Sequence, residues 1–172
     1  ALKQYTQSLM KNIDGYKKRT LKLDLLILSH LHEDHTSGLD SLLESMRVDT
    51  VILPYLCPIE RLIIASIKLN LPSWYYEFLS DPVTFLIERG VSRVVFIGGE
   101  GSPPEDGNYG DYGPLPENRE QRMNLDGMPD DEMLADEIRK NEPQLDNYIN
   151  EKKLLIKQHR GHVRAAGIWF FR

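Results

Sequence analysis

Three histidines and two carboxylates lie within one run of six residues, His30-Leu31-His32-Glu33-Asp34-His35. Neutral imidazole suits zinc, iron and copper, and a carboxylate suits a harder or borderline ion. His30 and His32 are two residues apart, so on an extended loop they point the same way and can bind one ion. Asp34 and His35 are adjacent and can face a second ion, with Glu33 turned outward. The cluster therefore predicts a site for two metal ions; the alternative is a His-rich surface loop that binds metal only adventitiously.

A strand and a helix must position this cluster. Residues 21–28 form a dense apolar run that is too short for a long helix and suits a strand buried on both faces. Residues 39–46 place their leucines and a methionine at helical spacing, so that they form one apolar face. The candidate ligands therefore lie where a buried strand turns into a helix.

The rest of the chain alternates predicted helices and strands, which indicates an α/β architecture. Asp81 is expected to cap the helix that begins at the following proline, and Gly90 is expected to end that helix. The expected helices cover residues 2–18, 39–46, 58–67, 74–79 and 82–89, and the expected strands cover residues 21–28, 48–53, 91–97, 153–157 and 165–171.

Residues 103–150 differ from the rest of the chain in composition. They hold 13 of the 26 acidic residues, 4 of the 21 basic residues and many of the prolines and glycines. Such a segment buries too little apolar surface to order itself, so we expect a flexible acidic insertion with one short helix near residues 131–140. The remaining body is mildly basic and could meet an anionic substrate, unless the acidity marks only a solvated linker.

Residues 25–39, LLILSHLHEDHTSGL, resemble the strand, ligand loop and helix start of the metallo-β-lactamase superfamily. The resemblance implies an α/β fold of the αββα sandwich type. Residues 1–102 would form the first half of that domain, residues 103–150 would be the insertion, and residues 151–172 would continue the same domain as strands. The family takes its remaining ligands from a later half, so we expect the chain to be a fragment or half-domain of a larger protein.

The resemblance also assigns roles to individual residues. It implies that His30 and His32 hold one metal ion and that Asp34 and His35 hold a second. His162 lies in a GHV segment that is similar to the family's later histidine segment, and its alternative is a basic surface turn. Zn2+ is the expected metal, two ions per site, with iron or manganese as alternatives. Asp34 would be catalytic because it also orients the nucleophile, although it could instead cap a helix that begins near residue 37.

The activity that the resemblance implies is that of a metal-dependent hydrolase. A metal-bound hydroxide, available because zinc lowers the pKa of water to about 7, would attack an ester-type bond. A phosphodiester is the favoured substrate because basic residues cluster at 17–19 and 160–164, and it leaves nucleic acid open as a partner; a small molecule is the other option. The sequence holds no nucleophilic-serine elbow, phosphate loop or dinucleotide-binding glycine pattern.

A different class of function stays open. The chain could be a non-catalytic module that keeps the fold and binds a partner through residues 74–76 and the acidic segment, or it could be an inactive fragment. Metal content separates the two, because a binding module would retain no metal and would keep its partner after chelation.

The remaining expectations concern location and assembly. Cys57 is the only cysteine, so an internal disulfide is excluded, which fits a reducing compartment and a cytoplasmic location. No apolar stretch approaches the length of a membrane span, so no membrane partner is expected. The oligomeric state is left open by the sequence.

Overall fold

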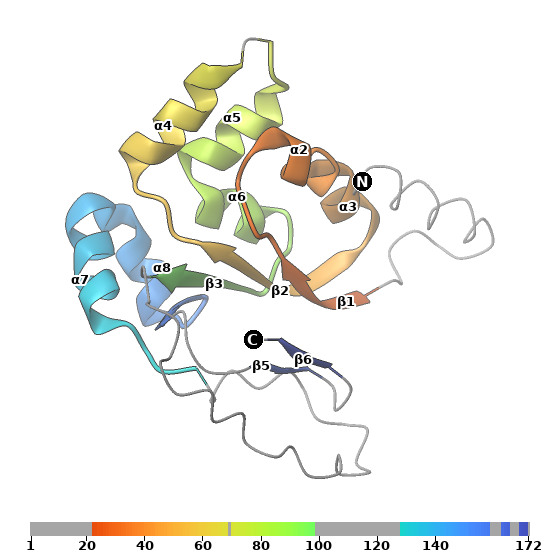
Figure 1. Cartoon of the computed structure of the whole chain (residues 1–172). Helices are drawn as coiled ribbons and strands as arrows, with labels where there is room; N and C mark the ends of the chain where they lie inside the picture. The colour runs from red at the N-terminus through yellow and green to blue at the C-terminus, as the bar shows by residue number, and fades with distance from the viewer. Residues whose placement is uncertain (1–21, 69, 99–127, 159–162, 166–168, 172) are drawn as a thin grey trace, which may run out of the picture.

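Four parallel strands form the central sheet of the computed structural model, which describes residues 22–68, 70–98, 128–158, 163–165 and 169–171. Their order across the sheet is the same as their order along the chain (Figure 1). The strands are β1 (Lys22–Ile27), β2 (Arg47–Pro54), β3 (Arg93–Gly98) and β4 (Leu154–Gln158). Two short strands, β5 (Val163–Ala165) and β6 (Trp169–Phe171), form a separate antiparallel pair.

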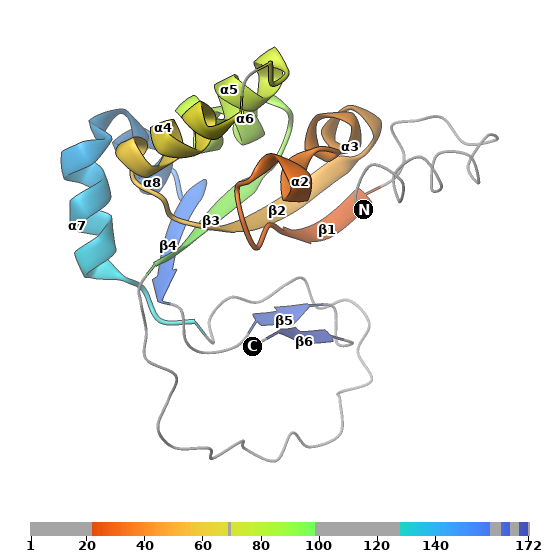
Figure 2. The same cartoon turned by 45° about the horizontal axis from the view of Figure 1, so that its top comes forward.

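Helices connect successive strands, as the alternating pattern predicted. Crossovers between parallel strands are right-handed, so a sheet whose spatial order follows the chain collects its helices on one face. Figure 2 shows α2 to α6 on one side of the sheet and the β5–β6 pair on the other. The predicted α/β class is therefore confirmed. The helices are α2 (Glu33–Thr36), α3 (Leu39–Ser45), α4 (Pro58–Ile67), α5 (Ser73–Ser80), α6 (Pro82–Glu88), α7 (Glu132–Asn141), the 3-10 helix η1 (Pro143–Leu145) and α8 (Asp146–Asn150).

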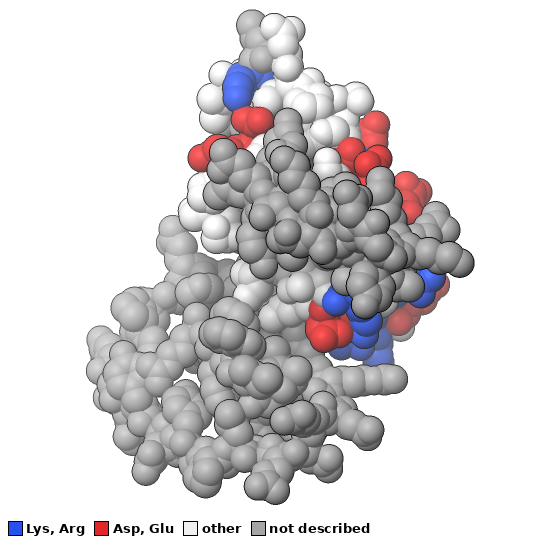
Figure 3. Space-filling view, turned by 90° about the vertical axis from the view of Figure 1, so that its right-hand side faces the viewer, with Lys and Arg blue, Asp and Glu red and all other residues white. Residues whose placement is uncertain are grey.

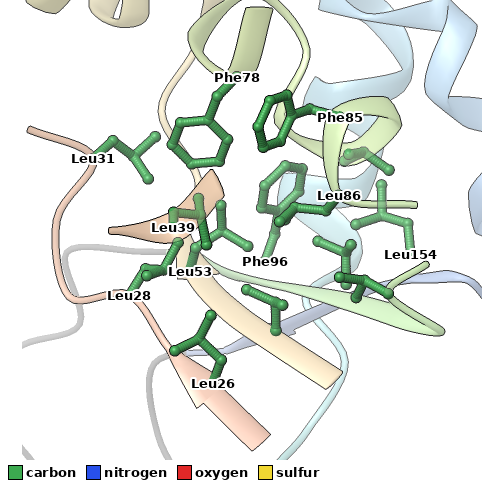
Figure 4. Close-up of a cluster of buried hydrophobic side chains, with 14 of the residues drawn as sticks. Leu26, Leu28, Leu31, Leu39, Leu53, Phe78, Phe85, Leu86, Phe96 and Leu154 are labelled. Atoms are coloured by element: carbon green, nitrogen blue, oxygen red, sulfur yellow. The ribbon is translucent and has the colours of Figure 1, made fainter. Parts of the chain in front are cut away.

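Successive side chains of a strand point to opposite faces of the sheet, and aligned strands form rows of side chains across it. Two successive rows of this sheet are apolar, so both of its faces are apolar. One row across the sheet belongs to the main core together with side chains of the helices (Figure 4): Leu26, Val51, Val94 and Leu154. The next row lies on the opposite face: Ile27, Ile52, Val95 and Leu155. Within that second row, Ile52 and Val95 are buried and form a separate apolar cluster with Met128.

The short helix expected near residues 131–140 is confirmed by α7, but the expectation of a flexible insertion over residues 103–150 is wrong for residues 128–150. This part folds into α7, η1 and α8 and contributes Leu134, Ile138 and Leu145 to the main core. Apart from the buried Glu142, most of its acidic side chains face solvent, whereas its few aliphatic side chains are spaced so that they point inward. The average composition of residues 103–150 did not reveal this inward-facing set of aliphatic side chains. Residues 103–127 lie outside the described residues.

Two close contacts attach the 128–150 segment to the body. Gly98 ends β3 directly beneath Leu134, and a Cβ atom at this glycine would overlap that leucine side chain. At the other end of α7, the carboxylate of Glu142 forms a buried ion pair with Arg61 of α4. The hydroxyl of Tyr55 is buried in the same region, and burial together with the negative charge of Glu142 raises its pKa well above the ordinary value.

Several local predictions can be checked directly. The Asp81 side chain accepts a hydrogen bond from the amide of Thr84 and so caps α6, as predicted. The expected strand at residues 165–171 is instead divided between β5 and β6. The expected helix at residues 2–18 lies outside the described residues. Among the helices that are described, none is both long and apolar enough to cross a membrane.

Candidate metal centre

Residues 30–35 (the metal loop) follow the first strand of the sheet and run into α2, which contains the last three of them. The amide of Leu28 still bonds to the carbonyl of Ile52, at 2.8 Å, so the strand pairing continues to within two residues of the loop. The loop therefore lies at the carboxyl end of a parallel strand, which is the edge at which open α/β sheets bind their ligands. This placement agrees with the position predicted for the cluster.

The candidate donor side chains gather on the outer surface of the metal loop. The ring of His30 lies 4.9 Å from that of His35 and 6.5 Å from that of His32, measured between centroids. Asp34 brings a carboxylate oxygen to 3.5 Å from Nε2 of His35. Nδ1 of His30 also forms a 3.0 Å hydrogen bond with the hydroxyl of Ser29, a contact that can orient the imidazole ring.

The donor types fit a divalent metal ion, but their present directions do not complete a site. Within the described part of the chain, no three His, Cys, Asp or Glu side chains are grouped so that they could hold an ion. All four donors of the metal loop are exposed, so packing does not fix their rotamers and rotation can redirect their donor atoms. The chemistry of the donor set thus agrees with the prediction, whereas the coordination geometry stays a prediction.

His162 lies outside the described residues, and so does His159. The described chain reaches Gln158, where β4 ends at the same edge of the sheet as the metal loop. Two strands separate β1 from β4, which places their ends about 14 Å apart. Four residues can span at most about 14 Å. A role for His162 as a ligand therefore stays a prediction.

The backbone of the metal loop is held from beneath by two buried hydroxyl groups. Tyr75 of α5 donates a 2.8 Å hydrogen bond to the carbonyl of Leu31. Thr36 is fully buried, and its hydroxyl donates a 3.1 Å hydrogen bond to the carbonyl of His32. Burial, and then the negative charges of two loop carboxylates, raise the pKa of Tyr75 to about 12, so its hydroxyl keeps its proton at neutral pH.

The two acidic residues of the loop have different surroundings. Glu33 was expected to turn outward, away from the ions, and its carboxylate lies in an exposed ion pair with Lys68 at the end of α4, at 2.7 Å. Asp34 is 76% exposed at its side chain and is free to face an ion. It does not cap the following helix, because α3 begins at Leu39 and its N-cap residue is Gly38. The capping alternative for Asp34 is therefore excluded.

The residues that hold the loop were not identified from the sequence. Residues 74–76 were instead interpreted as a partner-binding surface, and this is wrong for Tyr75, which is 1% exposed. A signal was present in the spacing, because Tyr75, Phe78 and Leu79 recur at helical spacing and all three are buried. Trp74 is half-buried, and only Tyr76 of the three is exposed.

A surface hollow of about 860 Å³ lies at the opposite edge of the sheet, far from the donor side chains. It is bordered by the amino ends of β1 and β2 and by the turn before β3. Its charged lining mixes both signs, and the charged residues are Lys22, Glu44, Arg47, Asp49, Glu88 and Arg89. Parallel sheets bind ligands at their carboxyl edge, so we assign the candidate site to the metal loop.

Comparison with known proteins gives no relative of this chain. No protein-family model, curated protein or solved structure matches it.

Proposed function

We propose that the chain is part of a metal-dependent hydrolase of the metallo-β-lactamase superfamily that acts on an ester-type bond. The observation that carries the proposal is the metal loop itself: three imidazoles and a carboxylate, all exposed, at the carboxyl end of a parallel strand. Imidazole and carboxylate are donors that zinc and other divalent ions accept, and these lie at the edge where parallel sheets bind ligands.

Each donor has a proposed role within the loop. His30 and His32 would hold one ion, and Asp34 and His35 would hold a second. Bound metal ions would supply Lewis acidity and lower the pKa of a water molecule. Asp34 would orient the attacking water by accepting a hydrogen bond from it. The hydrogen bond between Ser29 and His30 can orient one imidazole ring. Zinc is the favoured metal because imidazole dominates the donor set.

The second apolar face of the sheet supports the sandwich form of the fold. Ile52 and Val95 are buried on the face opposite the helices, and Leu25 and Ile97 pack against them. A sheet that is apolar on both faces needs a layer on each side. In an αββα sandwich, a second sheet supplies that layer.

The substrate is proposed at the level of its class. Both a phosphodiester and a lactone present the electrophilic centre and leaving oxygen that such a site can process. On the face seen in Figure 3, the basic and acidic side chains of the described residues are interspersed. The sequence favoured a phosphodiester because of the basic residues at 17–19 and 160–164. Residues 17–19 and 160–162 lie outside the described residues, and Arg164 lies in β5. The phosphodiester therefore stays the proposed substrate on sequence grounds alone.

One observation favours a partner-binding module as the second candidate. Four apolar side chains of α4 face solvent and are each more than half exposed: Ile59, Leu62, Ile63 and Ile67. A row of this kind often marks an interaction surface. A binding role is compatible with catalysis, so this surface does not displace the hydrolase proposal.

Metal content and hydrolysis test the proposal together. The protein is purified without chelators, its zinc, iron and manganese are measured by elemental analysis, and its activity is assayed on bis(p-nitrophenyl) phosphate and on a lactone. The expected result is close to two metal ions per chain, with hydrolysis that EDTA abolishes and added zinc restores. A protein that binds no divalent ion from solution would contradict the proposal.

A further inference from the structure

We propose that Tyr75 is a positioning residue of the metal loop, whose buried hydroxyl sets the direction in which His30 and His32 leave the backbone. The inference rests on the proposed function, because it concerns the same site. It extends that function to a residue that lies outside the ligand motif and more than forty positions along the chain.

The first argument is the atom that Tyr75 binds. Its hydroxyl donates to the carbonyl oxygen of Leu31, and that oxygen belongs to the planar peptide that joins Leu31 to His32. A fixed oxygen fixes the orientation of the peptide plane, and with it ψ of Leu31 and φ of His32. The hydrogen bond therefore acts on the backbone between the two histidines that are proposed to share one ion.

The second argument is the rigidity of the donor. Tyr75 and the Leu31 side chain are each 1% exposed, and Figure 4 shows Leu31 pointing toward Phe78 in the core. The ring of Tyr75 lies 5.7 Å from that of Trp74, which in turn lies 6.3 Å from Phe85. A hydroxyl held in this packing cannot follow a moving loop, so the loop takes its position from the core.

The third argument is that the neighbouring carbonyl is held in the same way. The hydroxyl of Thr36 binds the carbonyl of His32, so two successive carbonyls of the loop accept hydrogen bonds from buried hydroxyls. The exposed donor side chains therefore extend from a backbone whose carbonyls are held by buried hydroxyl groups. Outer contacts of this kind typically change metal affinity about 10- to 100-fold when they are removed.

The chain offers a matched control. Tyr75→Phe keeps the aromatic ring and removes only the hydroxyl that binds the loop. Tyr55→Phe makes the same chemical change at a second tyrosine with a buried hydroxyl, and that hydroxyl lies near Glu142 rather than against the metal loop. Both tyrosines are held in the protonated form by burial, so the two variants differ mainly in the contact with the metal loop.

The experiment is a Co2+ titration of the wild-type protein and the two variants, followed by visible absorption and by competition with Zn2+. We expect Tyr75→Phe to bind Co2+ about 10- to 100-fold more weakly and with an altered d–d spectrum, and Tyr55→Phe to match the wild type. Circular dichroism and thermal unfolding of the metal-free proteins establish that each variant is folded.

The outcomes separate this inference from the proposed function. If the wild-type protein binds no Co2+ or Zn2+, the proposed function fails. If the wild type binds metal and Tyr75→Phe has the same affinity and spectrum, the positioning role is overturned while the proposed function stands. A Tyr75→Phe protein that does not fold would also overturn the positioning role, because the hydroxyl would then serve the fold as a whole.

Discussion

Arg61 and Glu142 form an ion pair in which each side chain is only 3% exposed, although the two residues are 81 positions apart in the chain. Arg61 also donates hydrogen bonds to the carbonyls of Leu79 and Ser80, at 3.1 and 3.0 Å. One guanidinium group thus connects α4 to the end of α5 and to the end of α7. Among the described residues, Nε of Arg61 and Oε1 of Glu142 have no hydrogen-bond partner, so the pair is incompletely compensated for its burial.

Removing one partner of this ion pair should destabilise the fold, whereas replacing both partners with apolar residues should not. We expect Glu142→Leu to lower the free energy of unfolding by about 3–5 kcal/mol, because it leaves the charge of Arg61 buried without a counter-ion. The double variant Arg61→Met/Glu142→Leu should recover most of that loss. Chemical denaturation of the wild type, both single variants and the double variant measures the coupling. A single variant as stable as the wild type would show that the charge is solvated.

Removing a buried side chain of α7 should also be costly, because this helix packs against the core. Ile138 is fully buried, so we expect Ile138→Ala to cost about 2–5 kcal/mol. Met133 lies on the same helix and is 87% exposed, so Met133→Ala is the control and should change stability by less than about 0.5 kcal/mol. Equal and small effects in both variants would mean that α7 does not pack against the sheet in solution.

Loss of a candidate ligand should remove metal and leave the fold intact. We expect His32→Ala to lose most of its bound zinc, because two histidines are proposed to share one ion. The imidazole is exposed, so the melting temperature of the metal-free protein should change little. Glu33→Gln is the control on the same loop, because Glu33 binds Lys68 and is not a proposed ligand. Calorimetric titration with zinc measures the affinity of each variant. Full zinc affinity in His32→Ala would show that this histidine is not a ligand.

The charge of Asp34 should matter more to turnover than to substrate binding. We expect Asp34→Asn to lower kcat by several orders of magnitude with a smaller change in KM, because asparagine keeps the shape but loses an anionic ligand and the group that orients the nucleophile. Steady-state kinetics at measured metal occupancy test this. Wild-type turnover in a fully loaded Asp34→Asn protein would end the catalytic assignment of the residue.

The raised pKa of Tyr75 predicts a dependence of stability on alkaline pH. Its pKa is about 12 in the folded protein and 10.0 ordinarily, so its contribution is complete below pH 10. Between pH 10 and about 12, the unfolded chain releases the proton first, and the free energy of unfolding falls as the pH rises. Tyr75→Phe lacks this group, so its stability should fall less steeply over that interval. Parallel curves for the two proteins in denaturation experiments across this range would contradict the prediction.

The order of elements and the place of the metal loop were predictable because they depend on local patterns. Residues 25–39 carry a short apolar run, a polar cluster and then helical spacing, and the structure forms a strand, a loop and helices in that order. Asp81 before a proline likewise has one common structural meaning, a helix cap. Such signals need only a few neighbouring residues.

The long-range contacts could not be predicted in this way. Nothing in the sequence around Arg61 indicates a partner 81 residues later. The helix near residues 131–140 was predicted, but its packing against the core through its few aliphatic side chains was not. The hydrogen bond from Tyr75 to Leu31 likewise depends on how α5 lies against the loop. Such contacts depend on how elements that are distant in the sequence pack against one another. The residues next to each contact in the sequence carry no signal that identifies its partner.

The metal loop is attached to the body through atoms that every amino acid possesses. Tyr75 and Thr36 bind main-chain carbonyls, and all four proposed donor side chains lie on the solvent side. Replacing the side chains at positions 30, 32, 34 and 35 therefore leaves the attachment in place. A protein engineer could exchange histidine for cysteine or glutamate there to favour a softer or a harder ion without redesigning the scaffold. The same freedom would let descendants of one ancestral gene diversify in the ion they use by point substitution alone.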